Sequence, residues 1–320
     1  MLNPYIGHPS QLAGVEEVRL VGGKGDGMRL LNLWNEAGLS MTVEADRCAD
    51  IYRLRVKGDN IGYFSPCGYV APEYYDAPEK GFLKSFTAGF LTTCGLENCG
   101  GPTDFNGQRL PLHGSIGNTP AEHIWWEEAE DAIRVHATVS DQVLFDRKLL
   151  LHRTLTLGKQ ENTLLLEDTV ENRGDAPEPV MLMYHINMGY PLLSETAKLQ
   201  SNASGVYLRS EAVPEEAWKR IDPPRPRTPE ICYRHLFEGR QEARIAMENP
   251  AIGRAVEMTF DPKDFPCLIQ WSLFSHRDYA LGLEPRNFPE GPKTKAAQQG
   301  KLHILQPGEK RRYWVRLRFR

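Results

Sequence analysis

The sequence has no long hydrophobic run. None of its stretches approaches the roughly 20 consecutive apolar residues that a membrane-spanning helix needs. The amino terminus also lacks the basic start and apolar core that are typical of an export signal. We therefore expect a soluble, cytoplasmic protein without a membrane partner.

Cysteine is scarce as well. Six cysteines in 320 residues, at irregular intervals, are too few for a disulfide framework, which fits a reducing compartment. Cys94 and Cys99 are separated by four residues, but no second Cys or His pair follows at the spacing of a zinc site. We expect free, mostly buried thiols and no metal centre.

Neither sign of charge dominates. The chain has 38 Lys and Arg against 42 Asp and Glu, a formal net charge of -4, and the two signs are well mixed. Proteins that bind nucleic acids usually carry a basic patch or stripe. The composition therefore argues against a nucleic-acid partner.

A sustained helical period is also missing, and this absence bears on the fold class. No long segment repeats apolar residues every 3.6 positions, and 28 glycines and 23 prolines interrupt the chain throughout. Residues 132–139 instead alternate apolar and polar side chains, which is typical of a half-buried strand. Residues 148–157 and 163–172 flank a turn-type cluster and predict a hairpin. Further strands are expected at residues 39–43, 51–56, 180–185, 243–247, 255–260, 268–273, 279–283 and 313–319.

This pattern predicts an all-β protein, a large antiparallel β-sandwich with few short helices. All-β folds often exceed about 200 residues as one unit. Because no linker or internal repeat divides the sequence, we expect a single domain over residues 1–320. Residues 211–230 should form an exposed excursion, since their prolines cannot hold a regular ladder. These are Pro214, Pro223, Pro224, Pro226 and Pro229.

Three ionisable side chains stand in unusual places. His113 lies in a loop rich in glycine and asparagine, which tolerates unusual backbone dihedrals. His185 ends the apolar run from residue 180, and Asn187 would point the same way from a strand. Glu284 ends the apolar strand 279–283, where burial would raise its pKa and make it a stronger base at neutral pH. Taken singly, each also has a purely structural explanation. His113 would be a hydrogen-bonded loop histidine, His185 a core histidine with its hydrogen bonds satisfied, and Glu284 a solvated glutamate at a strand end.

Three segments carry a family resemblance. Residues 98–114, which contain Leu-His-Gly, and residues 184–187, Tyr-His-Ile-Asn, resemble the two histidine segments of the galactose mutarotase (aldose 1-epimerase) family. Residues 281–292, which contain Leu-Glu-Pro-Arg-Asn, and the Leu-Gln-Pro-Gly-Glu that follows at 305–309 resemble the glutamate segment, the most specific match. The likeness covers roughly residues 90–320, and the chain looks closest to an uncharacterised aldose-1-epimerase-like branch.

The resemblance implies a galactose mutarotase-like supersandwich and an isomerase of carbohydrate metabolism that interconverts the anomers of a free aldose. In this chemistry a base removes the anomeric hydroxyl proton while an acid protonates the ring oxygen, so no cofactor is needed. The resemblance assigns Glu284 as the base, His185 as the acid and His113 as a second donor. Since the roles reverse when the ring recloses, both partners should have pKa values near neutrality.

Sugar contacts are expected from polar or aromatic side chains in or near the matching segments, although each of these also has a structural explanation. They are Arg47, Asn98, Asp104, Asn187 and Trp271. Two other functions stay open, a carbohydrate-binding module without chemistry and a lyase or hydrolase on the same fold. Inverting hydrolysis would need a second carboxylate about 6.5–9.5 Å from the first, such as Asp104 or Glu97. The oligomeric state also stays open, with a homodimer as one alternative.

Overall fold

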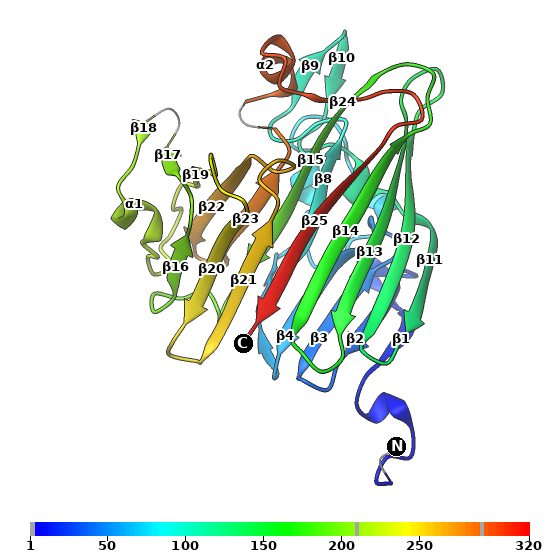
Figure 1. Ribbon diagram of the computed structural model, residues 1–320, viewed down its shortest axis with the longest axis vertical. Coiled ribbons are helices and arrows are strands. Elements are labelled where there is room, and N and C mark those ends of the chain that lie inside the picture. The colour runs from blue at the N-terminus through cyan, green and yellow to red at the C-terminus, as the bar shows by residue number, and fades with distance from the viewer. Residues whose placement is uncertain (1–3, 209–210, 289–290) are drawn as a thin grey trace.

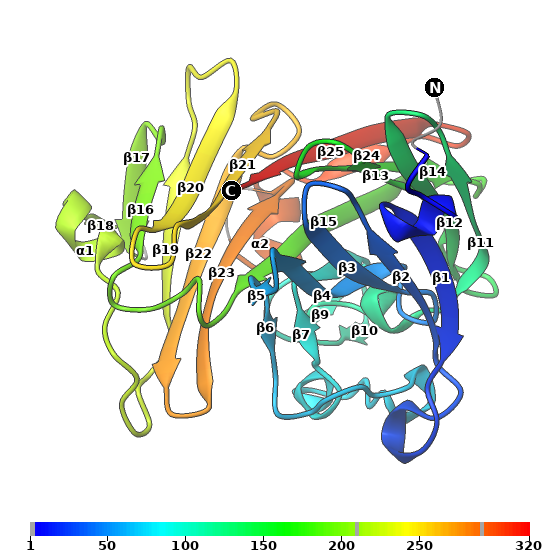
Figure 2. The same ribbon diagram turned by 90° about the horizontal axis from the view of Figure 1, so that it is seen from below.

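The computed structural model describes residues 4–208, 211–288 and 291–320. Within these residues two large antiparallel sheets face one another (Figures 1 and 2). The 13-stranded sheet has the order β1 (Gly14–Arg19), β2 (Arg29–Trp34), β3 (Leu39–Glu44), β4 (Asp50–Val56), β8 (Leu91–Leu96), β15 (Glu178–Met188), β23 (Asp278–Arg286), β22 (Cys267–Ser275), β19 (Ile231–Leu236), β17 (Gly205–Leu208) and β18 (Glu211–Ala212). In addition, β5 (Asp59–Asn60) pairs with β4, and β24 (His303–Leu305) pairs with β15.

The 8-stranded sheet has the carboxy-terminal strand in its interior, shown in red in Figure 1. Its order is β11 (Ala121–Glu128), β12 (Ala132–Gln142), β13 (Lys148–Gly158), β14 (Thr163–Asn172), β25 (Lys310–Phe319), β21 (Arg254–Phe260), β20 (Ala243–Asn249) and β16 (Lys198–Ser201). Two small ribbons pair β6 (Tyr63–Phe64) with β7 (Ala88–Gly89), and β9 (Thr103–Phe105) with β10 (Gln108–Leu110).

Helical structure is limited to short pieces within the described residues. The α-helices are α1 (Glu215–Lys219) and α2 (Lys293–Gln298), and the 3-10 turns are η1 (Pro9–Gln11), η2 (Gly23–Gly25), η3 (Pro72–Tyr74), η4 (Gly81–Lys84) and η5 (Ile116–Asn118). The predicted all-β sandwich is confirmed, and every strand expected from the sequence overlaps an observed one. None of the described helices is long and apolar enough to cross a membrane.

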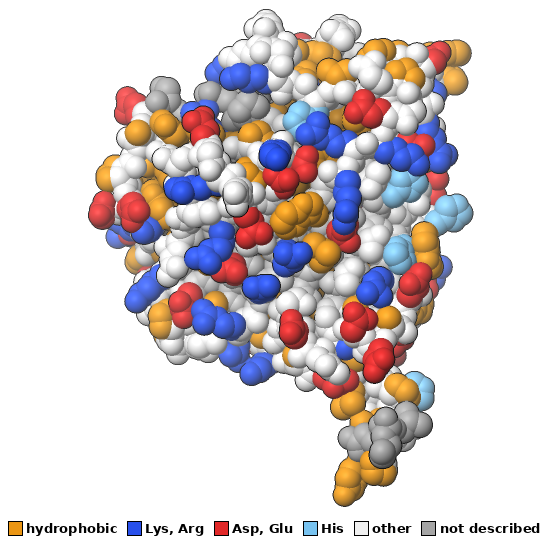
Figure 3. Space-filling model, viewed as in Figure 1, with side chains coloured by type: hydrophobic (Ala, Val, Ile, Leu, Met, Phe, Trp, Pro, Cys, Tyr) orange, Lys and Arg blue, Asp and Glu red, His pale blue; other side chains and the backbone are white. Residues whose placement is uncertain are grey.

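The core lies between the two sheets and follows from strand alternation. In β13 every second side chain is buried, including Leu151 and Leu155, and β14 repeats this pattern. From the other sheet, Ile186 and Leu283 belong to the same cluster of buried side chains. The alternate side chains of the 8-stranded sheet, which point away from the core, face solvent. Figure 3 shows basic and acidic groups interspersed on this face.

A buried ionic network joins the sheets. Arg153 of β13 contacts Asp168 of β14 at 2.7 Å and Asp50 of β4 at 2.6 Å. The same guanidinium donates to the hydroxyl of Thr93, and Tyr184 of β15 donates to Asp168. Pairing of this kind is needed because an unpaired buried charge is costly. The network fixes β15 with Tyr184 turned toward the 8-stranded sheet, so His185, the next residue, points to the opposite face.

The proline-rich segment 211–230 is anchored to the body of the protein. It forms only β18 and α1 before β19 begins, which agrees with the expected lack of a regular ladder. However, Trp218 and Ile221 are buried and join the core, and Ala217 accepts a hydrogen bond from the Tyr233 hydroxyl. The segment is therefore partly buried, which corrects the exposed excursion predicted from its prolines.

Candidate active site

A cavity of about 410 Å³ lies on the face of the 13-stranded sheet that points away from the 8-stranded sheet. Strands β15, β23, β22 and β19 form its floor, and η4 with the loops near residues 101 and 113 forms its roof. The lining residues are Lys80, Phe82, Leu83, Phe86, Gly100, Gly101, Pro102, Leu112, His113, Met183, His185, Glu230, Cys232, Ile269, Trp271, Glu284 and Arg286. The cavity therefore contains all three members of the predicted catalytic trio.

Strand register brings the acid and base candidates together. In the β15–β23 ladder Ile186 pairs with Leu283 and Asn187 with Gly282, so His185 lies directly opposite Glu284. Directly opposed residues in a sheet present their side chains on the same face. The floor continues across β22 as two rows, His185–Glu284–Ile269 and Asn187–Gly282–Trp271.

The Glu284 carboxyl is buried and faces His185. Its Oε1 lies 3.1 Å from Nε2 of His185, and only 4% of the residue is exposed. Oε1 has no hydrogen-bond partner among the described residues. Gly282 makes this position accessible, because a Cβ atom there would lie 2.5 Å from Oε1. The oxygen is thus held beside the imidazole and stays available to a ligand.

Asn187 sets the tautomer of His185. Its Oδ1 lies 2.7 Å from Nδ1 of His185, while its Nδ2 donates to the carbonyl oxygens of His185 and Ala88. With the amide oriented in this way, Nδ1 of His185 must be the donor. In the neutral ring Nε2 is therefore the acceptor, and it faces Glu284.

His113 has the opposite tautomer. The backbone N–H of Gly100 donates to its Nδ1 at 3.3 Å, which leaves the proton of the neutral ring on Nε2. Its φ of 60° lies in the left-handed region, and its carbonyl accepts from Gly95 N–H. The ring centroids of His113 and His185 are 5.7 Å apart. The loop thus presents a hydrogen-bond donor above His185 and Glu284.

Burial shifts the pKa values of all three groups toward their neutral forms. It raises the pKa of Glu284 to about 8, an effect that Arg286 opposes and Glu230 adds to. Burial lowers the pKa of His185 to about 3, with the neighbouring His113 contributing, and lowers that of His113 to about 4. At neutral pH the Glu284–His185 pair therefore has one transferable proton, located on the carboxyl.

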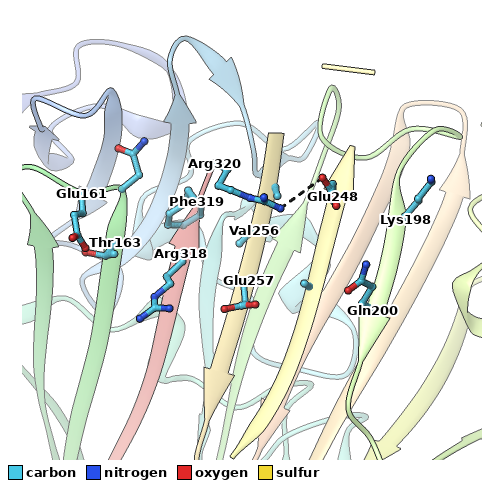
Figure 4. A pocket seen from close by; sticks show the side chains of 13 residues that line it. Glu161, Thr163, Lys198, Gln200, Glu248, Val256, Glu257, Arg318, Phe319 and Arg320 are labelled. Atoms are coloured by element: carbon cyan, nitrogen blue, oxygen red, sulfur yellow. Dashed lines mark ion pairs between the residues drawn. The ribbon is translucent and has the colours of Figure 1, made fainter. Parts of the chain in front are cut away.

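A second hollow, of about 460 Å³, lies on the outer face of the 8-stranded sheet and has a different character. Figure 4 shows charged and polar side chains from β14, β25, β21, β20 and β16 around it, with Arg320 3.6 Å from Glu248. These two side chains are 75% and 45% exposed. It contains no member of the trio and no strongly buried ionisable group, so the cavity on the other sheet is the better candidate site.

A protein-family model described as "Domain of unknown function (DUF4432)" matches residues 25–319. The chain belongs to this family. No curated protein sequence matches the chain.

Solved structures extend the comparison of this DUF4432 protein. A Klebsiella pneumoniae protein named "putative aldose 1-epimerase" is 24% identical with a TM-score of 0.86, covering 95% of this chain and 83% of that one. A galactose mutarotase-like protein from Clostridium acetobutylicum is 12% identical with a TM-score of 0.69, covering 97% and 99%. The galactose 1-epimerase from Lactobacillus acidophilus is 16% identical with a TM-score of 0.66, covering 96% and 99%. At these identities the likeness shows the fold, which is galactose mutarotase-like.

Of the five residues expected to contact a sugar, the DUF4432 protein places only Trp271 in the cavity lining. Arg47 is buried, and its guanidinium donates to the carbonyl oxygens of residues 70, 85 and 117 and to an Asn side chain. Asn98 donates to two carbonyl oxygens and so holds the loop that leads to His113. Asp104 is 77% exposed and pairs with Arg109. Asn187 is hydrogen-bonded to His185. Arg47, Asn98 and Asn187 therefore stabilise the structure around the site, and Asp104 lies outside it.

The structure adds cavity residues that the sequence analysis did not name. Arg286 follows Glu284 by two positions, so strand alternation alone could have placed it on the same face. Glu230 accepts a hydrogen bond from Nε1 of Trp271 at 2.8 Å. Phe82 and Phe86 enclose the imidazoles from the roof, at centroid distances of 5.3 Å from His113 and 5.2 Å from His185. Within the described residues no cluster of three or more His, Cys, Asp or Glu side chains is placed to hold a metal ion.

Proposed function

We propose that this DUF4432 protein is a cofactor-independent isomerase that interconverts the anomers of a free aldose. The observation that carries the proposal is the separation of 3.1 Å between Nε2 of His185 and Oε1 of Glu284, both facing one cavity. The ring oxygen and the anomeric hydroxyl of a hemiacetal are bonded to the same carbon. Each can therefore meet one of these two atoms at the same time, as concerted proton transfer requires.

In the ring-opening step Glu284 removes the proton of the anomeric hydroxyl while His185 protonates the ring oxygen. The C–O bond to the ring oxygen breaks, and an open-chain aldehyde forms. Rotation about the bond next to the aldehyde carbon then exposes its other face. For reclosure Glu284 returns its proton to the carbonyl oxygen while His185 accepts the proton of the attacking hydroxyl, which gives the other anomer.

Each half of this cycle needs a different protonation state of the pair, and of the two partners Glu284 has the expected near-neutral pKa, whereas His185 does not. Opening needs a carboxylate with an imidazolium, and reclosing needs a carboxyl with a neutral imidazole. The second state is the one that burial favours in the free protein, because it leaves no charge in the apolar site. One proton transfer over 3.1 Å from Glu284 to His185 converts it into the first.

His113 and the aromatic walls complete the site. Its Nε2–H, fixed by the Gly100 contact, can donate to an oxygen that gains negative charge during opening. Phe86 and Trp271 contact the His185 ring edge to face, at centroid distances of 5.2 and 5.4 Å. By displacing water, these rings strengthen the electrostatic interactions inside the cavity.

Anomer exchange measured by saturation-transfer NMR on a panel of reducing sugars tests the proposal. We expect faster exchange for at least one sugar, a loss of about 10²- to 10⁴-fold in Glu284→Gln, and wild-type rates in Glu248→Gln, a matched control on the outer sheet face. Saturable sugar binding without faster exchange for any sugar would instead establish a binding module and contradict the proposal.

Glu230 favours a second candidate, an inverting glycoside hydrolase. It is a carboxylate in the same cavity, next to β19, which is separated from β23 by one strand. Two strand spacings are about 10 Å between backbones, close to the carboxyl separation of about 6.5–9.5 Å in inverting enzymes. Release of nitrophenol from aryl glycosides, lost in Glu230→Gln, would support hydrolysis. Anomer exchange that survives in Glu230→Gln, without such release, supports the isomerase.

A further inference from the structure

Aromatic rings make up most of the cavity wall beside the imidazole of His185. Four side chains of the lining surround this imidazole, one through a distance of 3.1 Å between its carboxyl oxygen and Nε2, and three through ring-centroid distances of 5.2, 5.4 and 5.7 Å. In this order they are Glu284, Phe86, Trp271 and His113. Three of the four neighbours are therefore rings, and one of these, Phe86, has no polar atom.

The polar atoms of the other three neighbours already have a partner or a task. The indole N–H of Trp271 donates to the carboxylate of Glu230 at 2.8 Å. In the proposed mechanism Oε1 of Glu284 receives the anomeric proton, and Nε2–H of His113 donates to the oxygen that gains negative charge. None of these atoms is left for a further hydroxyl group beside the imidazole.

Phe86 and Phe82 form a continuous hydrocarbon surface in this wall. Their ring centroids are 5.0 Å apart, and both rings line the cavity. The main chain next to Phe86 is fixed from behind, because the carbonyl oxygen of Ser85 accepts a hydrogen bond of 2.7 Å from the buried guanidinium of Arg47. An apolar surface thus stands beside the imidazole that protonates the ring oxygen.

The bonding of an aldose brings one substituent close to this surface. The ring oxygen lies at Nε2 of His185 in the proposed mechanism, C5 is bonded to the ring oxygen, and the exocyclic carbon C6 is bonded to C5. C6 therefore stays beside the imidazole, whereas C3 and its hydroxyl lie across the sugar ring. A hydroxyl on C6 would lose water at Phe86 without gaining a partner, which costs free energy. A methyl group in its place would gain free energy from burial.

We propose that the substrate is a 6-deoxy aldose, whose C6 methyl group packs against Phe86 and Phe82 while the hemiacetal lies over His185 and Glu284. This inference rests on the proposed function, because it names the substrate class of the same site. A hydrophobic pocket rejects a substrate with one added hydroxyl by up to about 100-fold. The two phenyl rings therefore select the sugar, and the acid–base pair carries out the proton transfers.

The test compares kcat/KM for anomer exchange within pairs of sugars of the same D or L series that differ only in the C6 hydroxyl. The pairs are quinovose with glucose, fucose with galactose, and rhamnose with mannose. We expect the deoxy sugar of at least one pair to exceed its parent by about 10- to 100-fold. The matching pentose, xylose, arabinose or lyxose, lacks C6 and should be slower than the deoxy sugar; an equal or higher value would overturn the methyl contact.

Two substitutions place a hydroxyl in the apolar wall with little change in its shape. In Phe86→Tyr the ratio of kcat/KM between deoxy and parent sugar should fall toward one, and Phe82→Tyr makes the same change at a second position. The ratio is used because any effect on the His185–Glu284 pair is common to both sugars and cancels. Phe64→Tyr in β6, partly buried and outside the lining, is the matched control and should leave the ratio unchanged.

Equal kcat/KM values in every pair would overturn the inference and leave the proposed function intact, and so would a high ratio that neither Phe86→Tyr nor Phe82→Tyr lowers. If no sugar is turned over, the proposed function fails, and calorimetric binding decides the inference. Tighter binding of a 6-deoxy sugar than of its parent, with a difference that Phe86→Tyr reduces, would support the deoxy ligand in a protein without isomerase activity. Equal or absent binding of both sugars would overturn both.

Discussion

Replacing Glu284 by Gln should lower activity and raise stability at the same time. Burial raises the pKa of Glu284 from an ordinary value of 4.5 to about 8, so the folded protein keeps the proton that the unfolded chain has already lost. Between these pH values the folded state binds more protons than the unfolded state, and the free energy of unfolding therefore falls as pH rises. At about 1.4 kcal/mol per pH unit, the loss is about 3 kcal/mol at pH 7 and about 5 kcal/mol above pH 8.

The Gln side chain has nearly the shape of the protonated carboxyl and no proton to lose. We therefore expect wild type and Glu284→Gln to unfold in urea within about 1 kcal/mol of each other at pH 5. The variant should become more stable by about 3 kcal/mol at pH 7, with no further gain above pH 8. Glu248→Gln, on the outer face of the other sheet, should follow the wild type at every pH.

The opposite result would refute the proton assignment. A Glu284→Gln protein that is less stable than the wild type at all pH values would mean that the carboxylate is ionised and stabilised by a protonated His185 in the free protein. In that case the site would begin its cycle as an ion pair. Removal of one partner of a buried ion pair typically costs about 3–5 kcal/mol, so the two cases are well separated.

Further substitutions and conditions test other parts of the site. If Glu284 and His185 share one proton, kcat/KM should hold up to about pH 8 and fall above it with a slope of one; a fall beginning near pH 6.5 would indicate an unperturbed imidazole. Asn187→Ala should lower kcat about tenfold with little change in KM, because it acts through the His185 tautomer; a KM effect alone would indicate sugar contact. Gly282→Ala should displace the Glu284 carboxyl and lower kcat/KM about 100-fold, checked alongside the circular dichroism spectrum. Arg153→Met should lower the free energy of unfolding by about 3–5 kcal/mol in urea titrations, whereas an unchanged midpoint would contradict the role given to the buried network.

The strands that can be predicted from sequence are those with one face in the core. β12, β13 and β14 alternate because solvent covers their other face, and this alternation is visible in the sequence. All six residues of β8 are buried, since the core lies on one side and the roof loops on the other, so no alternation marks it. β1 cannot be predicted for the opposite reason, because only Gly14 in it is fully buried.

The same limit applies to the candidate site. His113, His185 and Glu284 could be selected because local pattern and family resemblance both indicate them. Gly282 could not, since its role depends on a register between β15 and β23 that local sequence does not specify. Arg47 shows the converse: its charge suggested a ligand contact, but backbone oxygens from distant loops and one Asn side chain occupy its guanidinium.

Under the proposed function, the floor and the roof of the cavity have separate roles, and this bears on how such proteins diversify. His185 and Glu284 lie on two directly paired strands in the interior of a large sheet, where a shift of one residue in register would reverse every side chain. The roof consists of η4 and the loops near residues 101 and 113, and such turns and loops tolerate insertion and substitution far better than strands do. Under the proposed function, a lineage can therefore change its preferred sugar by altering this cover while the floor that holds His185 and Glu284 stays the same.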